Sequence, residues 1–212
     1  MRVLEAELRQ GLAKLALQLG DVQIAQLLDY LDLLQKWNKV YNLTAVRDAA
    51  SMLSHHLLDS LAVIGPLQRH VAGRALRILD VGSGGGLPGV VVAICCPGLR
   101  VDCVDTVAKK AAFVQQVAVT LQLPNLRGLH NRVEQLAGPY DVVVARAFAA
   151  LADLVQWSAA ALVQEGVWLA MKGKHPVEEL AVLPPNITVF HVEQLQVPML
   201  SAERCLLWLR RG

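Results

Sequence analysis

The sequence lacks the features that mark secreted, membrane-spanning or metal-binding proteins. Aromatic residues make up only 5% of its 212 residues, and its four cysteines form no Cys-x-x-Cys pair. Two of them, Cys95 and Cys96, are adjacent, and all four lie in apolar surroundings, which indicates buried, reduced thiols rather than a disulfide framework or a zinc site. The N-terminus has no continuous apolar stretch followed by a cleavage site, so no signal peptide is predicted and we expect a cytoplasmic protein.

An excess of charge of one sign is also missing. The 20 Lys and Arg residues nearly balance the 18 Asp and Glu residues, so a nucleic-acid binder would need a local basic patch. The longest uncharged run, Val81 to Leu99, could span a bilayer, but its six glycines and two prolines favour a strand, a loop and a buried helix. The 54% hydrophobic content excludes disorder and predicts one large core with an appendage.

Residues 1–65 carry a helical period, because their leucines recur every three or four positions. Asp21 and Asp48 are expected to cap the second and third helices. Gly20 is expected to end the first helix, and Gly65-Pro66 the third. We therefore predict an N-terminal helical segment over residues 1–65 that packs on the core.

From residue 75 onward, short β-rich runs alternate with helical patterns, which predicts a parallel sheet covered by helices. The last two runs have no helix-length segment between them, which predicts an antiparallel hairpin. This order predicts an α/β, Rossmann-like, seven-stranded methyltransferase domain over residues 66–212. The expected strands are 76–81, 101–105, 126–130, 141–145, 167–171, 187–195 and 205–210; the expected helices are 87–95, 107–122, 150–163 and 176–182.

A glycine-rich loop over residues 80–89 directly follows the first expected strand. It fits both a dinucleotide fingerprint and the loop that binds S-adenosylmethionine (SAM). A dinucleotide fingerprint has its first glycine at the end of the strand, here Gly82, and its third then falls on Leu87. Since that side chain would obstruct a pyrophosphate, the register favours SAM. A dinucleotide site and a ligand-free turn remain the alternatives.

Asp105 ends the second expected strand, at the sheet edge where open α/β folds bind ligands. Its carboxylate is expected to accept hydrogen bonds from ribose hydroxyls. Capping of the helix that starts near Val107 is the alternative. Asp80 is expected to orient the glycine loop rather than to touch the ligand.

Several motifs along nearly the whole chain resemble the ribosomal small-subunit methyltransferase G family, also called glucose-inhibited division protein B. They are Trp37-Asn38-Lys39-Val40-Tyr41-Asn42-Leu43-Thr44, His56-x-x-Asp59-Ser60, the loop from Asp80 to Gly89, Val104-Asp105-Thr106 with Lys109-Lys110, Arg132-Val133-Glu134, Arg146-Ala147-Phe148 and Lys172-Gly173.

The resemblance implies SAM-dependent methylation of guanosine N7 in the decoding-region loop of small-subunit (16S) ribosomal RNA. It also implies which positions contact the cofactor. These are Gly82, Leu87, Val133, Glu134 and Arg146.

The sequence lacks the Asp/Asn-Pro-Pro-aromatic motif of enzymes that methylate exocyclic amines; the corresponding place reads Ala145-Arg146-Ala147-Phe148. The N7 atom of guanine has a free lone pair, so no general base and no catalytic residue of that kind is predicted. Arg146 is expected to contact the cofactor carboxylate or a phosphate, with a structural salt bridge as the alternative.

Four basic residues are candidates for RNA contacts, although solvated surface positions remain the alternative for each. They are Lys36, Lys109, Arg132 and Lys172. No metal site is predicted at His55 and His56, because adjacent residues on a helix point apart; packing or a hydrogen bond to Asp59 is expected.

Three other functions remain compatible with the sequence: a methyltransferase for small molecules or proteins, a nicotinamide-dependent oxidoreductase, and a non-catalytic SAM-binding module. The expected partner is small-subunit ribosomal RNA or the ribosomal subunit, and no membrane is involved. The oligomeric state cannot be predicted, and a monomer is assumed.

Overall fold

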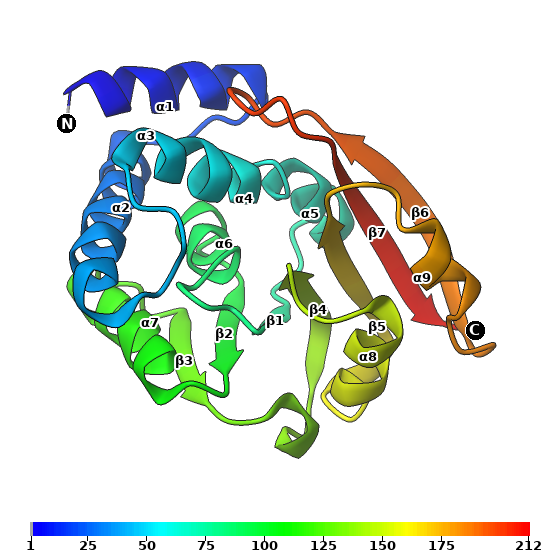
Figure 1. Cartoon of the computed structure of the whole chain (residues 1–212). Helices are drawn as coiled ribbons and strands as arrows, with labels where there is room; N and C mark the ends of the chain where they lie inside the picture. Colours follow the sequence, from blue (N-terminus) through cyan, green and yellow to red (C-terminus); the bar gives the residue numbers. More distant parts are fainter. Residues whose placement is uncertain (1) are drawn as a thin grey trace.

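The computed structural model describes residues 2–212, which fold around one seven-stranded sheet (Figure 1). The strand order is β3-β2-β1-β4-β5-β7-β6, and β7 runs opposite to the other six strands. The predicted fold class, with its C-terminal hairpin, is therefore confirmed. The strands are β1 (Arg77–Val81), β2 (Arg100–Asp105), β3 (Leu126–His130), β4 (Tyr140–Arg146), β5 (Leu162–Lys172), β6 (Ile187–Leu195) and β7 (Arg204–Arg211).

Helices cover both faces of this sheet. The N-terminal ones are α1 (Arg2–Lys14), α2 (Asp21–Tyr41), α3 (Ala49–Met52), the π-helix η1 (Leu53–Leu58), α4 (Asp59–Leu61) and α5 (Ile64–Val71). The others are α6 (Gly89–Cys95), α7 (Ala108–Thr120), the 3-10 helix η2 (Val133–Gln135), α8 (Leu151–Ser158) and α9 (Val177–Ala181). Within residues 2–212, none of these helices combines the length and apolar character needed to cross a membrane.

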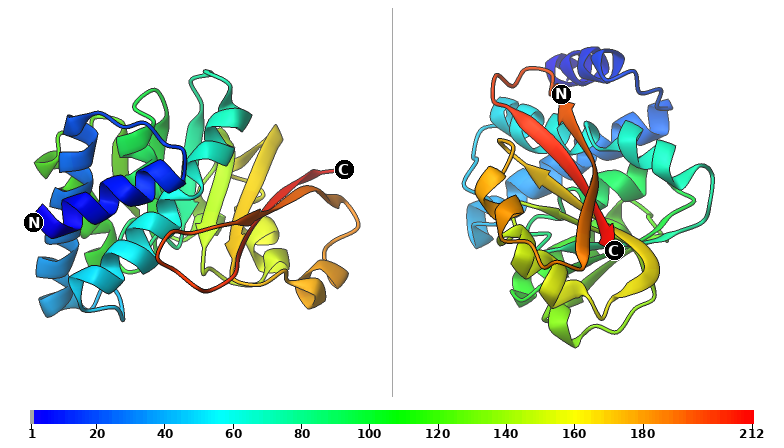
Figure 2. Two further views of the ribbon diagram at one scale, coloured as in Figure 1. Left: turned by 90° about the horizontal axis from the view of Figure 1, so that it is seen from above. Right: turned by 90° about the vertical axis from the view of Figure 1, so that its right-hand side faces the viewer.

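Alternation of side chains along the strands divides the core into two layers. Ile78 and Val142 join a cluster with the N-terminal helices, α6 and α7. Their neighbours Leu79 and Val143 face the opposite side, where α8 packs. Figure 2 shows the N-terminal helices and the β6–β7 hairpin from two further directions. The segment between these two strands reaches the first layer, where Val197 is buried.

The N-terminal helices share this first layer with the sheet. Helix α5 (Ile64–Val71) runs across the predicted boundary between residues 65 and 66. The division of the chain into two domains at that point stays a prediction.

The predicted end of the first helix and start of the second are wrong. Helix α1 ends at Lys14, and Ala16 takes a left-handed conformation with φ of 54°. Gly20, not Asp21, is the N-cap of α2, and its N–H donates to Gln23 Oε1 at 3.1 Å. Asp21 instead occupies the first turn, where its negative charge interacts favourably with the positive end of the helix dipole.

The predicted cap of the third helix is confirmed, but its predicted continuity is wrong. Asp48 accepts a hydrogen bond from Ser51 N at 2.8 Å. The segment then forms the π-helix η1, continues as α4, and breaks before α5. Gly65-Pro66 lies in the first turn of α5 rather than ending a helix. Proline is tolerated there because backbone N–H groups of a first turn have no partner within the helix.

All four helices predicted after residue 75 are shorter in the structure, and two of them have a clear local reason. The helix expected over 150–163 ends at Ser158, because β5 already begins at Leu162. The one expected over 87–95 begins at Gly89, because Leu87 and Pro88 belong to the turn after β1.

Candidate functional site

Polar groups on β1 and on α2 hold the loop after β1. The Asp80 carboxylate accepts from the backbone N–H of Gly89 at 2.7 Å, which closes the loop on its own strand and confirms the expected role of Asp80. The Tyr30 hydroxyl, on α2, donates to the carbonyl oxygen of Gly85 at 2.6 Å. The glycine-rich loop is therefore fixed in part by the N-terminal helical segment.

Gly82 is a residue of this loop at which a side chain is not tolerated. Its φ of +65° lies in the left-handed region, and a Cβ built on it would overlap the ring of Phe148. Phe148 follows β4, so the two neighbouring strand ends approach each other at this glycine. The absence of a side chain at Gly82 allows the ring of Phe148 to pack against the loop.

Asp105 links this loop to the next turn. One carboxylate oxygen accepts from Gly84 N at 3.0 Å, and the other accepts from Val107 N at 2.9 Å. The side chain is buried, and Lys110 Nζ lies 3.6 Å from it. Val107 is itself the N-cap of α7, so Asp105 stabilises the turn before the helix rather than serving as its cap. Its expected contact with ribose hydroxyls stays a prediction.

Two cavities lie at the carboxyl ends of the central strands and share Gly82. The larger one has a volume of about 400 Å³, which lies in the range of small-molecule sites. Its walls include Gly82, Asp105, Arg132, Val133, Glu134 and Phe148. The smaller one has a volume of about 180 Å³, and its walls include Leu34, Thr44, His56, Gly82, Leu87 and Arg146.

The structure thus brings all six predicted cofactor residues to this pair of cavities. Asp105, Val133 and Glu134 lie at the larger cavity; Leu87 and Arg146 lie at the smaller one; Gly82 lines both. An elongated ligand that passes over Gly82 would contact both groups.

Arg146, at the end of β4, forms the salt bridge that was the alternative expectation. Its Nη1 lies 3.0 Å from Asp59 Oδ2 and also donates to the carbonyl oxygen of His55 at 3.0 Å. The other oxygen of Asp59 accepts from Arg204 Nε at 2.8 Å. Arg146 nevertheless lines the smaller cavity, so the ion pair leaves it at the site.

His56 is a buried, neutral side chain of the site. Burial, with a smaller contribution from the charge of Arg146, lowers its pKa from 6.5 to about 4. The expected packing is observed, but the expected hydrogen bond to Asp59 is wrong. The Nε2 atom instead lies 2.6 Å from the Thr44 hydroxyl, while Asp59 is held by the two arginines.

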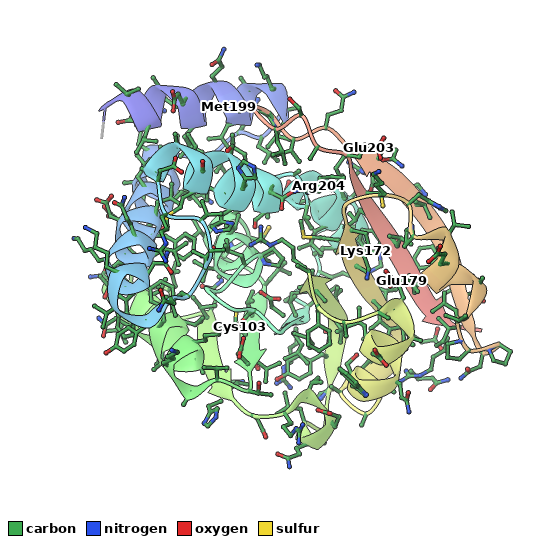
Figure 3. The ribbon with its side chains drawn as sticks, in the orientation of Figure 1. Cys103, Lys172, Glu179, Met199, Glu203 and Arg204 are labelled. Carbon is green, nitrogen blue, oxygen red and sulfur yellow. The ribbon has the colours of Figure 1, made fainter. Side chains whose placement is uncertain are left out.

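The four candidate RNA contacts differ in their surroundings. Lys172 Nζ donates hydrogen bonds to both carboxylate oxygens of Glu179, at 3.0 and 2.8 Å. Figure 3 shows this pair between β5 and α9. Arg132 lines the larger cavity. Lys36 and Lys109 are exposed on α2 and α7. The roles of these four residues in RNA binding stay predictions.

Sequence reasoning missed the contribution of the N-terminal helices to the site. Tyr30 carries a recoverable signal, since it lies on the inward face of α2 and a buried tyrosine hydroxyl requires a hydrogen-bond partner. Thr44 and Phe148 lie in motifs noted above, but nothing in the sequence indicates that they line a cavity. Their place depends on contacts with distant segments.

The chain is similar to known proteins in sequence along its length. A family model described as rRNA small subunit methyltransferase G matches residues 23–207. The ribosomal RNA small subunit methyltransferase G of Acidovorax ebreus is 67% identical, covering 98% of this chain and 95% of the relative. The protein with the same description from Albidiferax ferrireducens is 63% identical, covering 100% and 99%.

Solved structures show the same fold at low sequence identity. The N-methyltransferase NodS from Bradyrhizobium japonicum, in complex with S-adenosyl-l-homocysteine, is 14% identical with a TM-score of 0.59, covering 84% of this chain and 98% of that one. The magnesium protoporphyrin IX methyltransferase of Synechocystis, with S-adenosyl-l-homocysteine bound, is also 14% identical with a TM-score of 0.59, covering 87% and 99%.

Proposed function

This chain belongs to the rRNA small subunit methyltransferase G family, and we propose that it transfers the methyl group of SAM to N7 of a guanosine in 16S ribosomal RNA. The observation that carries the proposal is the pair of cavities that meet at Gly82. Residues from β1, β2 and β4 surround them, at the carboxyl edge of the parallel strands where folds of this class bind ligands.

The cavities fit the two halves of SAM. The adenosine half suits the larger cavity, where Asp105 accepts hydrogen bonds and Val133 offers an apolar contact. The methionine half suits the smaller cavity, where the Arg146 guanidinium can bind a carboxylate. When bound, SAM supplies an electrophilic methyl group on its sulfonium.

The side chains at the site favour a nucleophile that needs no deprotonation. His56 is the histidine at the smaller cavity, and its pKa of about 4 makes it a weak base near neutrality. The N7 lone pair of guanine is free without loss of a proton. Catalysis by this chain then rests on alignment of the two reactants and on the electrostatics of the site.

The proposal predicts a specific product and a flat pH dependence. Incubation with labelled SAM and isolated small ribosomal subunits should yield 7-methylguanosine, identified by mass spectrometry of the digested RNA. The single-turnover rate at saturating SAM should change little between about pH 6.5 and 9, because no base must be ionised. A rise of slope one across neutrality, or methyl transfer to an exocyclic amine, would contradict N7 chemistry; unmethylated RNA would contradict the function.

The same experiment tests the partner. Parallel reactions with naked rRNA and with the assembled subunit show which form of the RNA the chain accepts. Lys36, Arg132, Lys109 and Lys172 are the proposed RNA contacts, and modification of ribosomal RNA implies a cytoplasmic location. For Lys172, RNA phosphate would have to compete with Glu179.

Asp105→Ala should weaken SAM binding by about 1–3 kcal/mol, because ribose hydroxyls lose an acceptor and the Gly84 N–H loses its partner. Calorimetric titration with SAM measures the change. Asp141→Ala is the matched control: that carboxylate also accepts a backbone N–H, from Arg77 at 2.8 Å, but does not line either cavity. Equal SAM affinities of the two variants would show that Asp105 only stabilises the turn and does not contact SAM.

A further inference from the structure

Asp59 is a buried acid shared between two arginines from different parts of the fold. It begins α4 directly after η1, and it is 3% exposed. Arg146 reaches one of its oxygens from the end of β4, and Arg204 reaches the other from the start of β7. In Figure 3, Arg204 lies where the C-terminal hairpin meets the N-terminal helices. The carboxylate therefore joins three separate segments beside the site.

The π-helix contributes a second acceptor to the same arginine. Nη1 of Arg146 donates both to Asp59 and to the carbonyl oxygen of His55, which lies in η1. Such widened helical turns are frequent at functional sites. Two acceptors four residues apart thus fix the position of one guanidinium nitrogen.

Because this cluster is buried, the orientation of the Arg146 guanidinium depends on the Asp59 carboxylate. The Arg146 and Asp59 side chains are 17% and 4% exposed, so water cannot readily replace a missing partner. Without the charge of Asp59, Arg146 would keep one backbone acceptor and would face the uncompensated charge of Arg204. Its guanidinium would then no longer be held at the wall of the smaller cavity.

We propose that Asp59 is a positioning residue, which holds Arg146 at the smaller cavity in the orientation that receives the carboxylate of SAM. This inference rests on the proposed function, since it assigns the methionine half of SAM to that cavity. Asp59 itself does not line either cavity and acts through Arg146. Arg204 holds the second oxygen and thereby ties the hairpin to the same carboxylate.

A double-mutant cycle tests this proposal. Asp59→Asn should lower SAM affinity by about tenfold or more in the native background, and by less than about twofold in an Arg146→Met background. Isothermal titration of the full-length variants gives the four dissociation constants. In methylation assays, Asp59→Asn should raise KM for SAM by a similar factor and change kcat little.

Asp102→Asn is the matched control for loss of a buried, arginine-bound carboxylate. Asp102 is 4% exposed, pairs with Arg127 at 2.7 Å, and lies beside Arg77 on a part of the sheet outside both cavities. This variant should lose stability in thermal unfolding but keep its SAM affinity. A purely structural role for Asp59 would make the two variants alike.

Several results would overturn the inference. These are an unchanged SAM affinity in folded Asp59→Asn, or equal losses of affinity in both backgrounds of the cycle. If Asp59→Asn does not fold, Asp59→Glu replaces it, because the charge is kept while the carboxylate is displaced; it should again weaken binding only when Arg146 is present. A native chain that binds no SAM would instead overturn the proposed function on which the inference rests.

Discussion

Gly82→Val is expected to abolish measurable SAM binding, with a loss of at least about a hundredfold, or ~3 kcal/mol. A β-branched residue is strongly disfavoured at a φ of +65°, and its Cβ would overlap the ring of Phe148. Phe148 could relieve that overlap only by moving, and it is itself a wall of the larger cavity. A shift of the loop backbone or of Phe148 changes the space in which the two cavities meet. Calorimetric titration with SAM measures the loss.

The matched control for this substitution is Gly98→Val. Gly98 is exposed, and a Cβ built on it meets nothing within 4 Å. This variant should bind SAM as the native chain does. Gly82→Ala, which adds the Cβ without branching, covers the case in which the valine variant fails to fold. Native SAM affinity in folded Gly82→Val would refute the assignment of the cofactor to this loop.

A second large effect concerns the pH dependence of stability, where two buried groups oppose each other. Burial raises the pKa of Asp80 from 3.8 to about 7 and lowers the pKa of His56 from 6.5 to about 4. Between pH 4 and 7 the folded chain binds more protons at Asp80, so this group lowers the free energy of unfolding as pH rises. Between pH 4 and 6.5 the unfolded chain binds more protons at His56, so this group raises the free energy of unfolding as pH rises. The two effects nearly cancel.

Substitution of either group should therefore expose the effect of the other. In His56→Gln the free energy of unfolding should fall by about 3–4 kcal/mol, relative to the native profile, between pH 4 and 7. In Asp80→Asn it should rise by about 3 kcal/mol, relative to the native profile, between pH 4 and 6.5. Urea unfolding at a series of pH values measures both changes.

His191→Gln is the control for this experiment, because that histidine is exposed. It should reproduce the native profile. Profiles of His56→Gln and Asp80→Asn that both run parallel to the native one would contradict the assigned protonation states.

The parallel strands and the hairpin were predictable because their signals are local. The strand at 187–195 has the predicted bounds, since a short β-rich run between turn residues specifies it without help from distant segments. The strand at 126–130 also has the predicted bounds. The glycine loop was predictable for the same reason: its backbone geometry requires particular residues at fixed spacing. These local patterns were sufficient to place Gly82 and Asp105 at one edge of the sheet.

The contacts that complete the site depend on residues far apart in the chain. Tyr30 and Gly85 are separated by 55 positions, Asp59 and Arg146 by 87, and Asp59 and Arg204 by 145. No local period specifies such pairs. The π-helix was missed for a related reason, because its leucines keep a helical pattern and the widened turn is stabilised by what packs on it. Sequence reasoning therefore placed Arg146 at the site but could not identify its partner.

The hydrogen bond from Tyr30 to Gly85 also makes the N-terminal helices and the cofactor loop thermodynamically linked. A ligand that bound more tightly when this hydrogen bond is formed would stabilise the contact between α2 and the loop. Reciprocity requires the two effects to be equal in free energy. If an RNA that contacts α2, on which Lys36 is exposed, changes the affinity for SAM, then SAM must change the affinity for that RNA by the same factor.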